Sequence, residues 1–147
     1  MRLLTLTTLI AALALPAAAE QLQATMYKNP QCGCCEGHAD HLRRNGIAVT
    51  EIPTHDLMVV KRQRGVPPQL AGCHTIVVGD YVVEGHVPYH LIRRLLAEKP
   101  AIKGISLPGM PQGSPGMPGP KTEPFIYYEI DAAQTPSASI PRVFARE

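Results

Sequence analysis

The stretch "MYKNPQCGCCEGH", residues 26–38, places three cysteines within four positions: Cys32, Cys34 and Cys35. Cys32 and Cys35 form a C-x-x-C pair, which is the spacing of a dithiol redox centre. Cys34 is one thiol more than dithiol exchange needs. The pattern predicts a strand before the motif and a helix after it. We therefore expect the cysteines at a helix N-terminus, where the helix dipole and unpaired N–H groups stabilise a thiolate.

The rest of the first hundred residues alternates strand and helix patterns around this loop. Strands are predicted at 22–28 and 47–52, and two more within 74–87 around the turn dipeptide Gly79-Asp80. Helices are predicted at 35–45, at 55–64 and after Pro88, the first of them ending at Asn45-Gly46. The order β-α-β-α-β-β-α is that of a thioredoxin-like domain. The sequence therefore predicts an α/β fold of this class.

The chain begins with the features of a secretory signal peptide. Arg2 is followed by an apolar run, and the small residues Ala17-Ala18-Ala19 fit cleavage before Glu20. The apolar run is shorter than the roughly 20 residues that a spanning helix needs. We therefore expect residues 1–19 to be removed on export, bacterial periplasm to be the location, and no membrane span to remain.

Composition changes near residue 100. Residues 100–120 read "PAIKGISLPGMPQGSPGMPGP", and proline and glycine at this density disfavour helix and sheet interiors. We therefore divide the mature chain into a compact metal-binding domain, 20–99, and a Pro/Gly/Met-rich extension, 100–147. The segment "FIYYEI", 125–130, is expected to add one edge strand.

The charge balance of the chain argues against some classes of binding partner. The formal net charge is only +2, which argues against nucleic acid or an anionic membrane as the main partner. All four cysteines follow the signal peptide, and an even number in an exported protein first suggests disulfides. Three of them are crowded into one turn, however, where they could cross-link little of the chain. A purely structural role for them is therefore disfavoured.

The fourth cysteine is expected to meet the other three in space. In thioredoxin-like domains the loop before the hairpin carries a proline that faces the dithiol, whereas this chain has Cys73-His74 before Thr75. Four thiols and the imidazole of His74 are thus predicted to converge. Such a set favours a soft metal: Cu(I), Zn²⁺ or an iron–sulfur cluster. Because the adjacent Cys34 and Cys35 are expected to have difficulty pointing at one ion, thiolates bridging several copper ions are a further hypothesis.

For the other side chains that could bind a metal, the neighbouring sequence predicts whether they are ligands. Met110 and Met117 stand in a Gly/Pro segment with no core to fill, so both are candidate Cu(I) ligands, as is His86 at the end of the hairpin. The remaining donor-type side chains are assigned to the core or to the surface. Met26 and Met58 are expected in the core. His38 and His41 lie one turn apart, a spacing that can bind a metal, but a solvated helix face is favoured for both. His55, His90 and Glu84, together with the basic run Lys61-Arg62-x-Arg64, are expected on the surface.

Three segments resemble one family. They are "YKNPQCGCCEGHADHLRRNGI", "GVPPQLAGCHTIVVGDYVVEGHVP" and "IRRLLAEKPAIKGISLPGMPQGSPGM", and they are similar to the periplasmic copper-resistance proteins called CopG. The resemblance implies a thioredoxin-like domain whose extension helps to bind copper and which interconverts Cu(I) and Cu(II). Carried over by position, it implies a ligand set of Cys32, Cys34, Cys35, Cys73, His74, His86, Met110 and Met117. His38 departs from the family, which often has an aromatic residue at this position.

Three functions follow from the sequence. The first is a periplasmic, monomeric copper-binding protein for copper resistance, with copper ions and components of copper efflux or copper chaperones as its partners. Whether copper is turned over by an enzyme or only bound is left open. The second is a thiol–disulfide oxidoreductase that uses Cys32 and Cys35. The third is a structural zinc module with no redox role.

Overall fold

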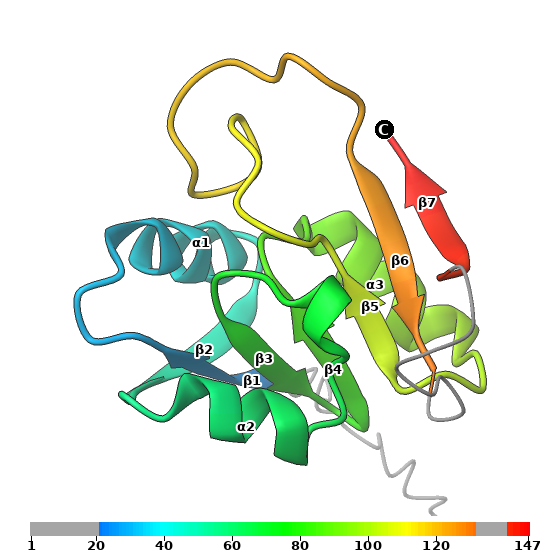
Figure 1. The fold of residues 1–147 in the computed structure, drawn as a ribbon, viewed down its shortest axis with the longest axis horizontal. Coiled ribbons are helices and arrows are strands. Elements are labelled where there is room, and N and C mark those ends of the chain that lie inside the picture. Colours follow the sequence, from blue (N-terminus) through cyan, green and yellow to red (C-terminus); the bar gives the residue numbers. More distant parts are fainter. Residues whose placement is uncertain (1–20, 132–140) are drawn as a thin grey trace, which may run out of the picture.

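The predicted alternation of strands and helices is present in the computed structural model, which describes residues 21–131 and 141–147 (Figure 1). The signal peptide expected at 1–19 lies outside the described residues. The first elements are β1 (Leu22–Lys28), α1 (Gly33–Arg44), β2 (Ile47–Pro53), α2 (Leu57–Gln63), a 3-10 turn (Pro68–Leu70), β3 (Thr75–Val78), β4 (Tyr81–Glu84) and α3 (Tyr89–Glu98). The order β-α-β-α-β-β-α and the α/β class are confirmed, whereas membership of the thioredoxin-like class stays a prediction.

The C-terminal segment adds three strands to the same sheet. They are β5 (Gly104–Ser106), β6 (Ile126–Ile130) and β7 (Val143–Arg146), and the strand order is β2-β1-β3-β4-β5-β6-β7. The expectation that residues 100–120 build no sheet interior is wrong, because β5 lies between β4 and β6. Ile105 and Leu107 explain the difference, since both are buried and β5 pairs in parallel with β4. The expected strand at 125–130 is present as β6, but β7 covers its outer edge. The domain boundary near residue 100 stays a prediction.

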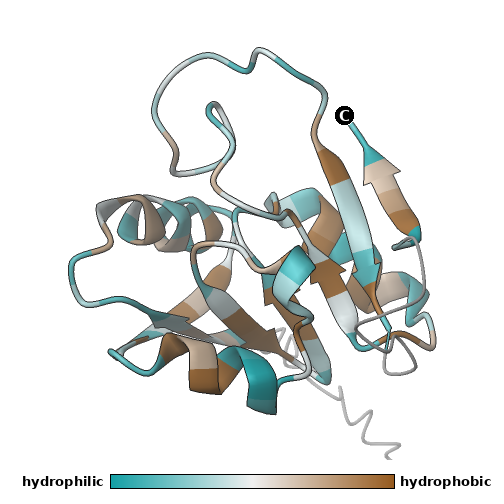
Figure 2. Cartoon of the chain, in the orientation of Figure 1, coloured by the Kyte–Doolittle hydropathy of each residue, from teal (hydrophilic) through white to brown (hydrophobic). Residues whose placement is uncertain are grey.

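One face of the sheet is an apolar core. The strand registers align four fully buried residues, one each from β1, β3, β4 and β5: Met26, Ile76, Val83 and Ile105. Leu42 of α1 and Ile92 of α3 belong to the same core cluster, so both helices cover this face. The hydropathy colouring shows brown residues along these strands and a paler, more hydrophilic loop between β5 and β6 (Figure 2). The core thus anchors α1 with its first turn at one end of the sheet.

The opposite face carries a row of buried polar residues beneath α2. Thr75, Glu84 and Ser106 are adjacent in the register, and all three are fully buried. Glu84 contacts the buried Lys61 of α2 and accepts hydrogen bonds from Thr75 Oγ1 (2.7 Å) and from the backbone N–H of Gly72 (2.7 Å). The predicted surface positions of Glu84 and Lys61 are therefore wrong. The reason is that β4 is covered on both faces, so the alternate residues of this strand are buried as well.

Helix α1 ends where the sequence predicts. Asn45 is its C-terminal capping residue, and Gly46 follows in the left-handed region with a φ of +90°. The helix begins two residues before the predicted start, at Gly33, so that Cys34 and Cys35 lie in its first turn. Among the described residues, no helix has the length and apolar character needed to cross a membrane.

Candidate metal centre

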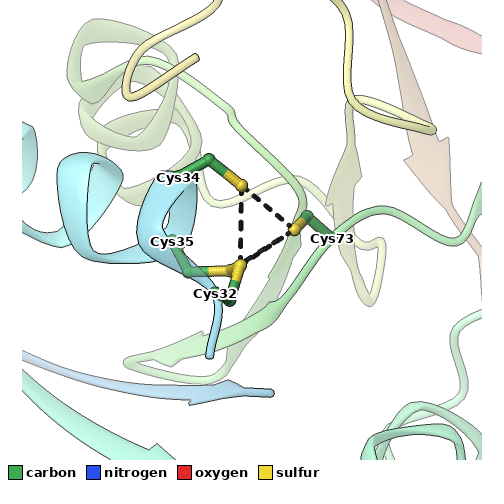
Figure 3. A group of neighbouring side chains, drawn as sticks. All are labelled: Cys32, Cys34, Cys35 and Cys73. Carbon is green, nitrogen blue, oxygen red and sulfur yellow. Dashed lines mark hydrogen bonds between the residues drawn. A yellow bond between two sulfur atoms is a disulfide. The ribbon is translucent and has the colours of Figure 1, made fainter. Parts of the chain in front are cut away.

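Four sulfur atoms converge at the N-terminus of α1. Cys73 Sγ, from the segment before β3, lies 3.2 Å from Cys32 Sγ, 3.5 Å from Cys34 Sγ and 3.3 Å from Cys35 Sγ. Figure 3 shows the four side chains pointing toward one another. We call Cys32, Cys34, Cys35 and Cys73 the thiol cluster. The structure therefore places Cys73 opposite the C-x-C-C motif, as the sequence predicts.

The cluster combines a disulfide with two thiols. Cys32 and Cys35 are joined by a disulfide with a Cα–Cα distance of 5.3 Å, whereas Cys34 and Cys73 are not part of any disulfide. Burial and the neighbouring Cys34 raise the pKa of the Cys73 thiol to about 12. Cys73 therefore holds its proton at neutral pH. Cys34 Sγ and Cys35 Sγ both lie within 3.5 Å of Cys73 Sγ, and the difficulty of pointing both at one ion stays a prediction.

An open cavity leads to the thiol cluster. Its volume is about 690 Å³, and its lining includes Cys32, Cys34, Cys73, Met110 and His55. Met110 is 56% exposed, so its thioether lies at the solvent side of this cavity. The lining of the cavity does not include Met117, a half-buried residue of the loop between β5 and β6. The predicted thioether donors are thus divided, with Met110 at the cavity and Met117 outside its lining.

Met58, a further side chain near Cys73, does not lie where the sequence predicts. Met58 of α2 is 57% exposed, and it lines a neighbouring cavity of about 350 Å³ together with Cys73 and Met110. Its predicted place in the core is therefore wrong, because the short helix α2 turns Leu57 and Lys61 toward the sheet and Met58 toward solvent. Met26, by contrast, is confirmed in the core.

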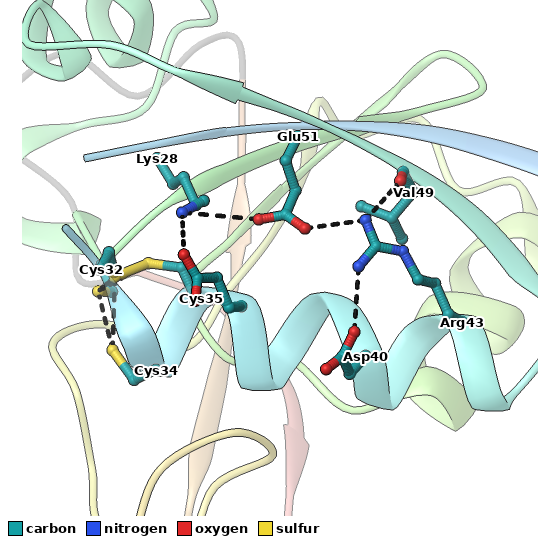
Figure 4. A network of polar contacts seen from close by, with 10 residues as sticks. Lys28, Cys32, Cys34, Cys35, Asp40, Arg43, Val49 and Glu51 are labelled. Carbon is teal, nitrogen blue, oxygen red and sulfur yellow. Dashed lines mark hydrogen bonds and ion pairs between the residues drawn. A yellow bond between two sulfur atoms is a disulfide. The ribbon is translucent and has the colours of Figure 1, made fainter. Parts of the chain in front are cut away.

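A chain of ion pairs ties the start of α1 to the sheet. Lys28, at the end of β1, donates to Glu36 Oε1 at 2.9 Å and lies 3.6 Å from Glu51 Oε2. Glu51 in turn accepts a hydrogen bond from Arg43 at 2.8 Å, and Arg43 pairs with Asp40 (Figure 4). These contacts join β1, β2 and both ends of α1. They therefore fix the position of the C-x-C-C motif relative to the sheet.

A separate group of three histidines lies one turn further along α1. His38 of α1, His74 next to β3 and His86 after β4 are all fully buried. One ring nitrogen from each lies within 4.8 Å of the others. We call these residues the histidine cluster. The predicted surface position of His38 is wrong, whereas His55 and His90 are exposed as predicted. His41 is half-buried beside His38.

The burial of His38 follows from the helical periodicity of the sequence. Cys35, His38, Ala39 and Leu42 follow the spacing i, i+3, i+4, i+7, and all four are buried. This is the apolar stripe of a helix that packs on a sheet, and His38 is its one polar member.

Backbone carbonyls determine where the imidazole protons lie. His38 Nε2 is 2.9 Å from the carbonyl oxygen of Val87, and His86 Nδ1 is 2.8 Å from that of Pro115. Because a carbonyl oxygen only accepts, both of these nitrogens carry hydrogen. His38 Nδ1 then accepts from His74 Nε2 at 2.7 Å. Among the described residues, His86 Nε2 and His74 Nδ1 are buried and have no hydrogen-bond partner.

The loop between β5 and β6 covers the histidine cluster. Pro115 supplies the carbonyl that binds His86, and the next residue, Gly116, lies directly against α1. A Cβ atom at Gly116 would lie 2.4 Å from the backbone nitrogen of His38 and 2.6 Å from the carbonyl oxygen of Cys34. Gly116 also has a φ of +87°, in the left-handed region. The close approach of this loop to α1 therefore requires glycine.

The comparisons with known proteins agree with this geometry. A family described as "Protein of unknown function, DUF411" matches residues 70–117. A comparison with curated proteins found no similar sequence. Two solved structures named "Copper resistance protein copG", form 2 and form 1, are 34% and 33% identical to this chain, with TM-scores of 0.78 and 0.77. Each alignment covers 87% of this chain, and 99% and 98% of the respective structures. By this similarity over most of its length, the chain belongs to the CopG family of copper resistance proteins.

Proposed function

We propose that this chain is an exported copper-binding protein of copper resistance, and that it binds Cu(I) through the thiol cluster. One observation carries the proposal: Cys73 Sγ lies within 3.5 Å of each of the other three sulfurs. Thiolates are soft ligands that select Cu(I). The cavity of about 690 Å³ gives an ion access to the cluster from solvent.

The compact arrangement also supports a multinuclear site. With sulfurs 3.2–3.5 Å from Cys73 Sγ, a thiolate that binds one ion is already close enough to bridge to a second. Met110, at the cavity, supplies a thioether ligand on the solvent side, and Met117 is the second thioether of the predicted set. His74 and His86 belong to the histidine cluster and are not included in this thiol site.

The disulfide supports a redox step on copper itself. In this step the Cys32 and Cys35 thiolates give up one electron each to two Cu(II) ions. The products are the Cys32–Cys35 disulfide and two Cu(I) ions, so that charge and electrons balance. Cys34 and Cys73 keep their thiols and remain to bind Cu(I). The reverse reaction returns Cu(II) and two thiolates.

The cellular setting forms part of the same proposal. The signal-peptide pattern in residues 1–19 places the mature chain in the periplasm, where copper ions, and copper efflux or chaperone components, are its partners. We propose that the chain acts there as a monomer.

Anaerobic titration with Cu(I) tests the proposal. We expect the reduced protein to bind more than one Cu(I) ion per chain, and Cys73→Ser to lower this number and weaken the affinity about 100-fold. Ser106→Ala is the matched control, because it removes a buried hydroxyl outside the cluster. Failure of the reduced protein to bind Cu(I) would overturn the proposal, and a stoichiometry of one or fewer would overturn the multinuclear site.

The Cys32–Cys35 disulfide also favours a second candidate, a thiol–disulfide oxidoreductase. This candidate predicts insulin reduction that survives both Cys73→Ser and strict metal removal. The copper proposal predicts no such activity. A structural zinc module predicts instead that the protein retains zinc in preference to copper and unfolds when zinc is chelated.

A further inference from the structure

The histidine cluster is a second group of metal-type donors, separate from the thiol cluster. Its members come from three parts of the fold: His38 from α1, His74 from the residue before β3 and His86 from the turn after β4. The ring centroids lie 4.8–5.3 Å apart, and all three rings are fully buried. Among the described residues no cysteine or carboxylate belongs to this group, so its donors are imidazole nitrogens alone.

The hydrogen bonds around the cluster prepare two rings to bind a metal. A metal-binding histidine commonly donates its second N–H to a backbone carbonyl, which fixes the ring and its tautomer. His38 donates in this way to Val87, and His86 donates to Pro115. The lone pairs of His38 Nδ1 and His86 Nε2 are therefore left for the interior of the cluster.

The spacing of the nitrogens suits an ion. Three imidazoles that each bind an ion at about 2.0 Å hold their nitrogens roughly 3.5 Å apart. The separation of His38 Nδ1 and His74 Nε2 is 2.7 Å, and every pair in the group lies within 4.8 Å. The value that an ion requires lies between these limits, so ring movements of about 1 Å are enough.

A buried nitrogen without a partner also suits an ion. Leaving such a nitrogen unpaired is costly, and His86 Nε2 is one such atom among the described residues. A bound ion satisfies it.

We propose that His38, His74 and His86 form a second metal site, which binds Cu(II) through three imidazole nitrogens. Imidazole accepts Cu(II), whereas the thiol cluster selects Cu(I), and Cu(II) forms the most stable complexes among the divalent first-row ions. The ion takes the place of the proton that His74 and His38 share. That proton moves to His74 Nδ1, which has no hydrogen-bond partner among the described residues.

The test removes the thiol ligands and then counts imidazoles. In the full mature chain carrying Cys34→Ser and Cys73→Ser, the Cys32–Cys35 disulfide leaves no thiolate to bind copper. With one equivalent of Cu(II), pulsed EPR is expected to detect three imidazole nitrogens on one ion. Adding His38→Gln is expected to lower the count to two and to weaken Cu(II) binding at least tenfold.

A matched control and a second measurement keep the test decisive. His41→Gln changes the next histidine of the same helix and is expected to leave the imidazole count and the affinity unchanged. If His38→Gln does not fold, the imidazole count in the thiolate-free parent still decides. Fewer than three imidazoles there, or equal Cu(II) binding with and without His38→Gln, overturns the proposal. Because no thiolate is present, neither result bears on Cu(I) binding by the thiol cluster.

Discussion

Cys34 and Cys35 of the thiol cluster and His38 of the histidine cluster lie on successive turns of α1, yet the two clusters provide opposite environments. Cys34 and Cys73 are half-buried beside an open cavity, and Cys73 holds a proton because burial raises its pKa. His38 and His74 are fully buried, and burial keeps them without a charge. The first cluster is thus open to solvent through a cavity, whereas the second is closed to it.

The two clusters also differ in what lies behind them. The Lys61–Glu84 ion pair is buried next to the thiol cluster, and Lys61 lines the cavity that contains Cys73. Backbone carbonyls of Val87 and Pro115 accept hydrogen bonds from the histidine cluster, and the charge of Lys61, after burial and the other two imidazoles, also lowers the pKa of His74. In our proposal, one helix therefore supports two sites whose ligands suit the two oxidation states of the same metal.

The largest expected effect comes from the charges behind the thiol cluster. Lys61→Met leaves Glu84 buried without its partner, and we expect the free energy of unfolding to fall by about 3–5 kcal/mol in urea denaturation. The double variant Lys61→Met/Glu84→Leu removes both charges and is expected to recover most of this loss. If the double variant is no more stable than Lys61→Met, the two buried charges do not offset each other as we propose.

Separate substitutions test whether the two clusters act independently. We expect Cys73→Ala to weaken Cu(I) binding about 100-fold and to leave Cu(II) binding at the histidines unchanged, because Cys73 is the sulfur common to the closest contacts of the thiol cluster. His86→Gln is expected to do the reverse. Competition titrations with Cu(I) and Cu(II) chelators measure both. Equal losses of both ions in either variant would show a single coupled site.

The sequence predicts well those features that depend on local pattern. The strand and helix order, the glycine that ends α1 and the position of Cys73 opposite the C-x-C-C motif follow from periodicity, turn residues and the order of elements. These features are local or depend only on topology. The convergence of the four cysteines was therefore predictable from the sequence.

The polar residues wrongly predicted on the surface share one physical cause. Glu84 and His38 are polar residues at positions that tertiary packing buries, and residue type alone suggests that they lie on the surface. Their burial depends on which faces of β4 and α1 are covered, a property of the whole sheet. The Pro/Gly-rich segment raised the same difficulty, since β5 is held by its pairing with β4 and β6. Long-range pairing overrides local propensity at such positions.

Gly116 tests how firmly the loop holds the histidine cluster closed. Gly116→Ala puts a Cβ atom against the backbone of α1 and strains a residue at a φ of +87°, so we expect a loss of about 1–3 kcal/mol in stability. Hydrogen exchange should rise in residues 111–119 but not in β1. Gly33→Ala is the matched control, because a Cβ atom there meets nothing within 4 Å. Unchanged exchange in Gly116→Ala would mean that the loop does not depend on this contact.

Over a single pH unit, the smallest expected effect is a dependence of the metal-free protein's stability on pH. In the unfolded chain an imidazole has a pKa of about 6.5, whereas in the folded chain that of His38 is lowered to about 3. Between these values the unfolded chain binds a proton that the folded chain does not, so stability falls as the pH drops below 6.5. The slope is about 1.4 kcal/mol per pH unit for each such proton.

Urea denaturation between pH 7 and pH 4 measures this slope. His38→Gln is expected to reduce it, because glutamine takes up no proton on unfolding. Ile76→Val, a non-titrating change in the core, should lower stability by about 0.5–1.5 kcal/mol at every pH and keep the wild-type slope. If His38→Gln also keeps the wild-type slope, His38 is protonated in the folded protein. The contrast between a neutral histidine cluster and a proton-bearing thiol cluster then fails at its central residue.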